Sequence, residues 1–374
     1  MCSMKNNSLP IVYVSPYYMP GFTSGANRRF DEICKRLVRD RGSDFTLIVA
    51  KGCVPQWWNG ENIHEVDYKF DHPSKFVATR QISNILDSLP HSIAIVESIP
   101  IPFKALKRHV HFQVAYDFRY FKSFSKSFLY RLIFSPYLKY QWGHSEFMVT
   151  PTEFSINEVV EHVGYPREKV LKSYFGIDEG LLDPKYREPI EKTIDVLYVS
   201  HFDGHKNHAP LLRAIALIDP KLRLTLIGQD NGKRAELEAL AKELGLTNVV
   251  FDAINDDNKM WKLYRSCRVF SFPSLYEGFG MPLIEALSLG VPTTCSDIPV
   301  FREIGGDLVT YYDPNNPDDI AKVVKEALDH GQTPSLEVVR NHVLRFTWDE
   351  IYEKYITDTE TFVAKSDLKL RTVE

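Results

Sequence analysis

Short apolar runs alternate with amphipathic stretches along most of the 374-residue chain. The apolar runs, such as LPIVYVS at 9–15 and IDVLYVS at 194–200, have the length of strands and lead into polar loops. Nearly continuous apolar strands are typical of parallel sheets that are covered on both faces. Between them, apolar positions recur at helical spacing, as in Phe30, Ile33 and Leu37. The alternation predicts βαβ units, and therefore an α/β protein with doubly wound parallel sheets.

The expected elements fall into two groups, separated by a polar segment at 179–192 that contains two prolines and has the composition of a linker. The first group defines an N-terminal domain at 1–178 and the second a C-terminal domain at 193–349. Strands are expected at 9–15, 45–50, 93–96, 111–117, 146–150, 170–178, 194–200, 223–228, 249–251 and 269–272, and helices at 27–37, 76–89, 151–162, 209–217, 233–244, 258–265, 318–328 and up to about 363.

The stretch Ser274–Pro292, SLYEGFGMPLIEALSLGVP, predicts a tight turn between a strand and a helix. Pro282 suits the first helical turn and Gly290 suits the helix stop. The glycine-containing turn brings bare backbone to the helix N-terminus, where unpaired N–H groups and the helix dipole favour phosphate or sugar oxygens. Glu277 on the turn and Glu285 in the helix are eight residues apart. Both carboxylates can therefore face one crevice.

Composition narrows the class of protein. The chain is 44% hydrophobic and 25% charged, which are ordinary values for a globular protein of two domains. Its net charge of −4 gives no reason to expect nucleic-acid binding. The five cysteines show no Cys-x-x-Cys spacing, which favours reduced thiols in the cytoplasm. The sequence contains no apolar run long enough for a transmembrane helix, and its polar N-terminus is unlike a signal peptide.

Two aromatic-rich segments allow two interpretations each. Residues 118–145 contain no Asp or Glu and combine aromatic with basic side chains. This composition suits peripheral contact with an anionic membrane, or a helix pair whose rings form the core of the first domain. Trp57 and Trp58 suit a platform for an acceptor, or a small satellite core. The cations of the first segment are Arg119, Lys122, Lys126, Arg131 and Lys139.

The stretch around Glu277 and Glu285 resembles the Glu-x7-Glu signature of retaining nucleotide-sugar glycosyltransferases of the GT-B fold, in family four. YRSC at 264–267 and DIPVFREIGG at 297–306 extend the resemblance. The resemblance implies two Rossmann-like domains that face a central cleft, the first for the acceptor and the second for the nucleotide-sugar donor. It also implies that a last helix, at about 350–374, packs back on the first domain.

The resemblance assigns roles to the residues of this stretch. Glu277 is expected to contact hydroxyls of the donor sugar and to be required for catalysis, and Glu285 to hold the ribose of the nucleotide. Backbone amides are expected to support the sugar and the diphosphate, and they belong to Gly278, Phe279, Gly280 and Met281.

Elsewhere the chain departs from the family pattern in part. Lys206 stands at the position of a lysine that meets the donor diphosphate, but His201 replaces the usual arginine. A neutral imidazole offers one donor where a guanidinium offers a charged fork. The resemblance implies that Gly25 belongs to a loop that approaches the donor diphosphate and the acceptor. Asp117 is expected beside the reacting sugar, preceded by Tyr116 where the family has histidine. Lys206 and Asp117 join Glu277 as the expected catalytic residues.

The implied reaction moves a hexose from a nucleotide-sugar to a glycan hydroxyl with retention of anomeric configuration. GDP-mannose is the favoured donor, with UDP- and dTDP-sugars as alternatives, and the favoured acceptor is a lipid-linked oligosaccharide of O-antigen or capsule type. No Asp-x-Asp occurs in the chain, so neither a metal nor a cofactor beyond the donor is expected. The expected location is the cytoplasm, at the inner face of the cell membrane. Two alternatives are a non-catalytic subunit that binds sugar nucleotides, and another GT-B chemistry such as an epimerase or a phosphorylase.

Overall fold

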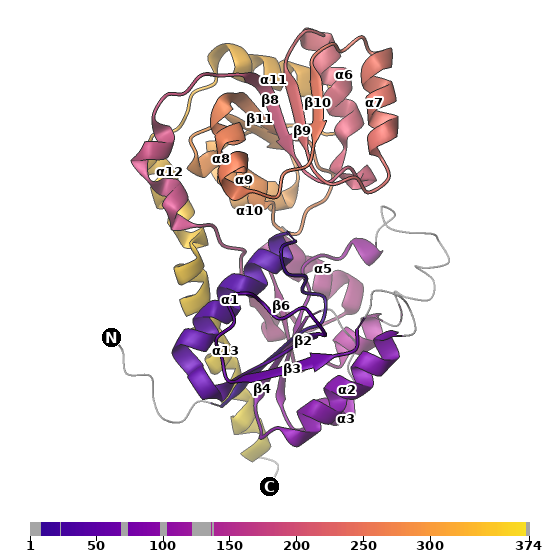
Figure 1. Cartoon of the computed structure of the whole chain (residues 1–374), viewed down its shortest axis with the longest axis vertical. Helices are drawn as coiled ribbons and strands as arrows, with labels where there is room; N and C mark the ends of the chain where they lie inside the picture. The colour runs from indigo at the N-terminus through magenta and orange to yellow at the C-terminus, as the bar shows by residue number, and fades with distance from the viewer. Residues whose placement is uncertain are drawn as a thin grey trace. The chain divides into compact units, whose positions relative to one another are not determined.

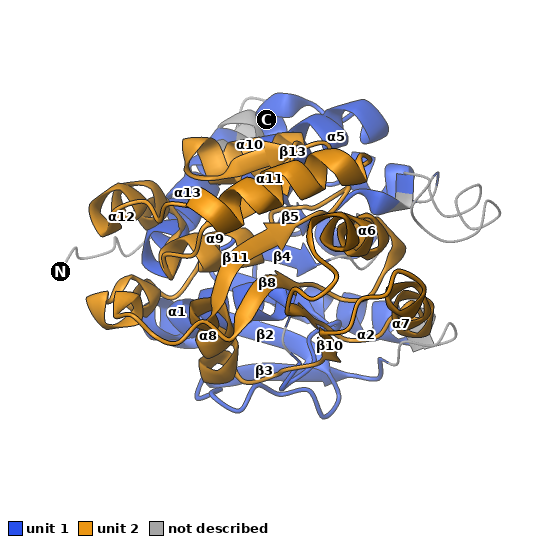
Figure 2. Ribbon diagram, turned by 90° about the horizontal axis from the view of Figure 1, so that it is seen from above, with its two compact units in different colours: residues 1–175, 348–374 blue, residues 176–347 orange. Residues whose placement is uncertain are grey.

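The computed structural model describes residues 9–22, 24–68, 74–97, 103–121, 136 and 138–371. The chain divides into two compact units (Figure 1), coloured separately in Figure 2. Unit 1 comprises Met1–Phe175 with Trp348–Glu374, and unit 2 comprises Gly176–Thr347. Each unit contains one sheet, of seven and six strands respectively, and the paired strands run parallel. The predicted α/β class with two parallel sheets is therefore confirmed.

The sheet of unit 1 has the order β3-β2-β1-β4-β5-β6-β7. Its strands are β1 (Ile11–Ser15), β2 (Phe45–Ala50), β3 (Asn62–Val66), β4 (Ile93–Glu97), β5 (Val110–Val114), β6 (Phe147–Thr150) and β7 (Val170–Lys172). Its helices are α1 (Gly25–Arg41), α2 (Ser74–Ser88), α3 (Phe103–Leu106), α5 (Glu153–Val163) and α13 (Trp348–Arg371), with a 3-10 turn η2 (Arg119–Phe121). Among the described helices, none combines the length and the apolar character that crossing a membrane requires.

Both faces of the unit 1 sheet are covered, because successive strand residues point to opposite faces. Tyr13 of β1 packs in a core with α1 and α13, which lie beside each other in Figure 1. Val12 and Val14 pack in a second core with α2 and α3. The α1 helix begins where the hydroxyl of Ser24 accepts a hydrogen bond from the Asn27 amide, at 3.1 Å. The apolar composition of the strands thus follows from burial on both sides.

The aromatic-rich segments pack into cores where they are described. Trp57 and Trp58 lie against the core of α1 and α13, and the Trp57 indole donates to Asp31 at 2.7 Å. Phe118 is fully buried, and its ring meets Trp142 edge-on at 5.4 Å. These contacts agree with the interpretation in which the aromatic rings of both segments pack into a hydrophobic core. Lys122, Lys126 and Arg131 lie outside the described residues, so membrane contact stays a prediction.

The sheet of unit 2 has the order β10-β9-β8-β11-β12-β13. Its strands are β8 (Ile194–Val199), β9 (Leu224–Ile227), β10 (Val249–Asp252), β11 (Cys267–Phe272), β12 (Thr293–Ser296) and β13 (Thr310–Tyr312). Its helices are α6 (His208–Ile218), α7 (Arg234–Glu243), α8 (Asp257–Ser266), α9 (Met281–Ser288), α10 (Pro299–Gly305), α11 (Pro317–His330) and α12 (Leu336–Val343).

The segment expected to be a linker, 179–192, belongs to unit 2. It contains two 3-10 turns, η4 (Glu179–Leu182) and η5 (Pro184–Arg187), and Leu181 and Leu182 are buried. The C-terminal helix α13 belongs to unit 1, and its Ile351, Tyr352 and Ile356 are part of the unit 1 core. The chain therefore passes between the units near Phe175 and again near Thr347.

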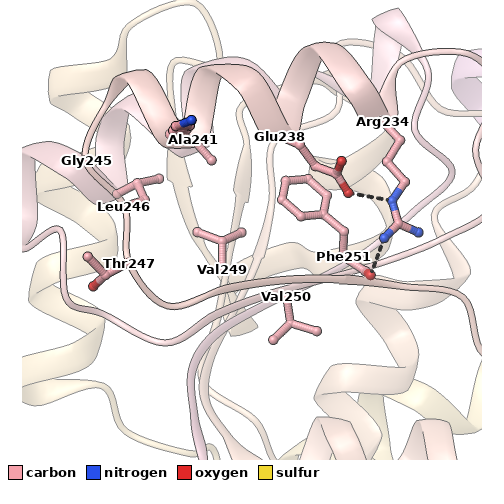
Figure 3. A pocket seen from close by; sticks show the side chains of 10 residues that line it. Arg234, Glu238, Ala241, Gly245, Leu246, Thr247, Val249, Val250 and Phe251 are labelled. Atoms are coloured by element: carbon pink, nitrogen blue, oxygen red, sulfur yellow. Dashed lines mark hydrogen bonds and ion pairs between the residues drawn. The ribbon is translucent and has the colours of Figure 1, made fainter.

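A shallow groove of about 710 Å³ lies at the edge of unit 2, between α7 and β10 (Figure 3). Arg234 pairs with Glu238 at 2.7 Å and donates to the carbonyl of Phe251, so its charge is already engaged. Val250 on the edge strand is 52% exposed. None of the predicted site residues lines this groove.

Asp195, near the start of β8, anchors unit 2 through two arginines. Its carboxylate lies 2.9 Å from Arg223 and 3.3 Å from Arg268. Hydrogen bonds from Arg223 lower the pKa of Asp195 to about 2. A carboxyl whose folded pKa is depressed stabilises the fold above its unfolded pKa of about 3.9, and this contribution is lost as the pH falls through the folded value.

We therefore expect Asp195→Asn to lower the melting temperature at neutral pH, with a difference from wild type that shrinks between about pH 4 and pH 2. Thermal unfolding followed by circular dichroism across this range measures the difference. A gap in melting temperature that stays constant down to pH 2 would contradict the proposed linkage.

Candidate functional site

The order of strands in unit 2 marks one crevice in its sheet. The chain runs outward from β8 to β9 and β10, then returns to place β11 on the other side of β8. The loops that follow β8 and β11 therefore leave the sheet in opposite directions, and ligands of doubly wound sheets bind between such loops, at the carboxyl ends of the strands. These loops are residues 200–207 and 273–280.

Hydrogen bonds join the two loops directly. The Leu275 amide donates to the His205 carbonyl at 2.9 Å. Tyr198, the fully buried tyrosine near the end of β8, donates to the Lys206 carbonyl at 2.8 Å and lies 3.0 Å from the Ser274 hydroxyl. Burial, and after it the charge of Glu277, raises the pKa of Tyr198 far above 10. Tyr198 therefore remains a neutral hydroxyl that ties the β8 loop to the β11 loop.

The side chains of Lys206 and Glu277 meet between the loops. The Lys206 ammonium lies 2.6 Å from the Glu277 carboxylate, with exposed side-chain fractions of 15% and 12%. The two charges thus form a largely shielded ion pair that still reaches solvent. Polar atoms of a donor that entered here would meet a cation and an anion within reach of each other.

The turn after Glu277 turns its large side chain inward and is buried from Phe279 onward. Phe279 is 4% exposed and its ring packs edge-on to Phe346 at 5.6 Å. Gly280 has a φ of +99°, and a Cβ atom there would lie 2.8 Å from the ring of Phe301. Met281 begins α9, with a proline in its first turn and the left-handed Gly290 just after its end. The sequence prediction of a glycine turn feeding a short helix is confirmed.

Glu285 lies on α9 and is 7% exposed. The Tyr264 hydroxyl of α8 donates to its carboxylate at 3.1 Å. Glu285 and Glu277 thus extend from one strand–turn–helix segment, but they contact different partners. Binding of a ribose by Glu285 stays a prediction.

The loop after β8 is shaped by a close approach of backbones. A Cβ atom on Gly228, which follows β9, would lie 1.9 Å from the Ser200 carbonyl oxygen, so only glycine fits there. His201 follows Ser200 and is partly exposed. His208, the first residue of α6, is 3% exposed, and burial followed by the charge of Lys206 lowers its pKa to about 3. His208 is therefore a neutral group next to Lys206, whereas Asp203 of the same loop lies 3.3 Å from His205.

The two predicted site residues of unit 1 have local contacts. Gly25, expected in a loop, is the first residue of α1 and follows the capping residue Ser24. Asp117 accepts a hydrogen bond from the Arg119 amide at 3.2 Å and forms an ion pair with its guanidinium at 3.0 Å. Asp117 therefore caps the turn η2, as a strand-end aspartate does.

The structure adds residues that the sequence reasoning did not select. Tyr198 and Ser274 link the two loops of unit 2, and a tyrosine ending a buried strand was the available signal for the first. In unit 1, Glu97 ends β4 and is only 5% exposed. The available signal was a carboxylate directly after an apolar run. The sequence prediction of a strand at 93–96 did not select it.

Comparisons with known proteins agree with this architecture. A crystal structure of a glycosyltransferase from Rickettsia africae superposes with a TM-score of 0.69 at 16% identity, over 96% of this chain and 99% of that one. At this identity the likeness shows the fold, which is GT-B. Residues 183–339, which lie in unit 2, match the family described as "Glycosyl transferases group 1".

Two curated relatives are similar over part of the chain. The O-antigen chain mannosyltransferase B of Escherichia coli is 25% identical over 55% of this chain and 58% of its own length. The N-acetylgalactosamine-N,N'-diacetylbacillosaminyl-diphospho-undecaprenol 4-alpha-N-acetylgalactosaminyltransferase of Campylobacter jejuni is 34% identical over 41% of this chain and 42% of its own length. The chain thus spans about half the length of these relatives.

Proposed function

We propose that this protein is a retaining glycosyltransferase that moves a hexose from a nucleotide-sugar to a hydroxyl of a glycan. One observation supports the proposal above all: Lys206 and Glu277 meet at the β8–β11 crevice, inside the segment that matches group 1 glycosyl transferases. A cation and a carboxylate side by side suit a donor that carries a diphosphate next to a sugar with several hydroxyls.

In the proposed reaction, the bond between the anomeric carbon and the diphosphate breaks as the acceptor oxygen bonds to the same face of the sugar. Lys206, the amides after Glu277 and the N-terminus of α9 stabilise the charge that grows on the departing diphosphate. The acceptor proton passes to the leaving phosphate oxygen. Glu277 holds hydroxyls of the sugar, and Glu285 holds the ribose. Neither the transfer of the sugar nor the transfer of the proton requires a metal or a further cofactor.

Mannose is the favoured sugar, and GDP-mannose the favoured donor, because one similar protein is an O-antigen chain mannosyltransferase. The second relative acts on a diphospho-undecaprenol glycan, which favours a lipid-linked acceptor at the inner face of the membrane. Its sugar is N-acetylgalactosamine, so UDP-sugars are the next donors to test.

A panel of GDP, UDP and dTDP is expected to raise the melting temperature of the protein, with the largest shift for GDP. A ligand that binds only the folded state stabilises it by about 2.7 kcal/mol at a concentration 100 times its Kd. The shift should persist in a chelator, as should transfer. A shift in melting temperature with UDP and none with GDP would contradict the choice of GDP-mannose as the donor. Binding without any hydrolysis or transfer of the matching nucleotide-sugar would favour a non-catalytic subunit.

A further inference from the structure

Unit 1 has its own crevice of the same kind, and a buried carboxylate sits there. The strand β1 lies between β2 and β4, so the carboxyl ends of β1 and β4 flank the point where the winding of the sheet reverses. Ser15 ends β1 and Glu97 ends β4, and they are 1% and 5% exposed. The Ser15 hydroxyl donates to the Glu97 carboxylate.

Glu97 accepts hydrogen bonds from three hydroxyl groups in all among the described residues. Tyr13 donates to Oε1 at 2.7 Å, Tyr116 donates to the same oxygen, and Ser15 donates to Oε2. An ionised carboxylate can only accept, so each hydroxyl must direct its single proton toward Glu97. The direction of three hydroxyl groups is therefore fixed by one side chain.

A buried cation accompanies this carboxylate. Arg29 of α1 is 1% exposed, and its Nη2 donates to the Ser173 hydroxyl at 2.9 Å. Its guanidinium carbon lies 5.9 Å from the ring of Tyr116 and 5.0 Å from the ring of Tyr355. A guanidinium keeps its charge in proteins. The cluster thus combines a buried guanidinium with the three hydroxyl donors of Glu97.

Tyr116 is less buried than the other three residues of this hydrogen-bond cluster. It is partly exposed, whereas Tyr13, Ser15 and Glu97 are buried. Burial, and after it the charge of Glu97, raises the pKa of Tyr116 far above 10, so its hydroxyl stays protonated. Since that proton is bonded to Glu97, only the lone pairs of the Tyr116 oxygen remain for a ligand.

We propose that Glu97 is a positioning residue for the glycan acceptor and acts through Tyr116. The inference rests on the proposed glycosyl transfer and extends it to the crevice of unit 1. Glu97 holds the Tyr116 proton inward, and the Tyr116 oxygen accepts a hydrogen bond from an acceptor hydroxyl other than the one that attacks the donor. This hydroxyl keeps its proton, so the contact orients the acceptor and takes no part in bond breaking.

The structure offers a matched pair of variants that separates this role from a merely structural one. Tyr116→Phe and Tyr13→Phe each remove one hydroxyl donor from the same oxygen of Glu97. Tyr13 is fully buried and cannot reach an acceptor. A structural role predicts similar effects of the two variants, whereas acceptor binding predicts an effect on the acceptor KM from Tyr116→Phe alone.

The experiment measures transfer from the nucleotide-sugar selected by the melting-temperature panel to methyl α-D-mannopyranoside, with KM determined for both substrates. Tyr116→Phe is expected to raise the acceptor KM by about three- to tenfold, the scale of one hydrogen bond, with the donor KM unchanged. Tyr13→Phe should lower the melting temperature and leave the acceptor KM as in wild type. Glu97→Met removes both carboxylate oxygens that accept these hydrogen bonds. It should raise the KM for the sugar acceptor as Tyr116→Phe does. Combining the two substitutions should cause no further rise in this KM.

The outcomes separate this inference from the proposed function. If no nucleoside diphosphate stabilises the wild-type protein, the proposed function fails and the inference fails with it. If the diphosphate binds all variants equally but Tyr116→Phe and Tyr13→Phe have the same acceptor KM, only the inference fails. If the wild-type protein binds the diphosphate but does not transfer a sugar to the mannoside, the proposed acceptor site is also wrong. Should Glu97→Met not fold, the comparison of the two tyrosine variants decides.

Discussion

The Glu277→Ala substitution is expected to reduce sugar transfer by about 10³-fold, the upper range for loss of one preorganised polar contact in an active site. It is also expected to leave nucleoside diphosphate binding intact or tighter. The second result follows from the ion pair, because Lys206 lies 2.6 Å from Glu277 and loses that partner in the variant. Its ammonium is then free to meet a phosphate without first giving up a carboxylate.

Transfer kinetics and calorimetric titration with the nucleoside diphosphate measure these two effects. Glu236→Ala serves as the control, since Glu236 forms an ion pair of the same length with Lys233 on the surface and is 69% exposed. Activity of Glu277→Ala within about threefold of wild type, less than 1 kcal/mol in barrier height, would remove Glu277 from the site. Weaker diphosphate binding would show that the pair does not compete with the donor.

The fold was predictable from sequence where burial decides the composition of a strand. The expected strand at 45–50 is the buried β2 at Phe45–Ala50, and the expected strand at 194–200 is β8 at Ile194–Val199. Of the strands that were not expected, β3, β12 and β13, the first two had no comparable signal. The β3 strand, NIHEV, lies at the edge of its sheet with partly exposed polar residues, and β12, TTCS, is a buried strand of small polar side chains. Their partners in the sheet determine both strands, and such context overrides the intrinsic preference of a residue.

The part of the candidate site that lies within one continuous segment of the chain was predictable from the sequence. The spacing of the glycine turn predicted the loop and the helix start of α9, because backbone geometry there depends on neighbouring residues. The contact between Lys206 and Glu277 spans 71 positions, and the resemblance to a family identified both residues without indicating that they pair. Glu97 and Tyr116 are 19 positions apart on separate strand ends, and only the strand order brings them together.

Lys206→Ala is expected to lower kcat by about 10²- to 10³-fold, because the departing diphosphate loses a charged stabilising group in a shielded site. In contrast to Glu277→Ala, it should weaken nucleoside diphosphate binding, since the same cation meets the phosphates before and after the reaction. Lys325→Ala is a suitable control, because Lys325 also lies 2.6 Å from a carboxylate, that of Asp329, but on the surface of α11.

The double variant tests whether the two residues act on one ligand. If Lys206 is the group that Glu277 restrains, the tighter diphosphate binding of Glu277→Ala requires Lys206. Combining Lys206→Ala with Glu277→Ala should then give the weak binding of Lys206→Ala alone, and the two effects should not add, as expected for residues in direct contact. Additive effects on diphosphate affinity would mean that Lys206 and Glu277 bind the donor independently, and that their ion pair at the crevice has no part in donor binding.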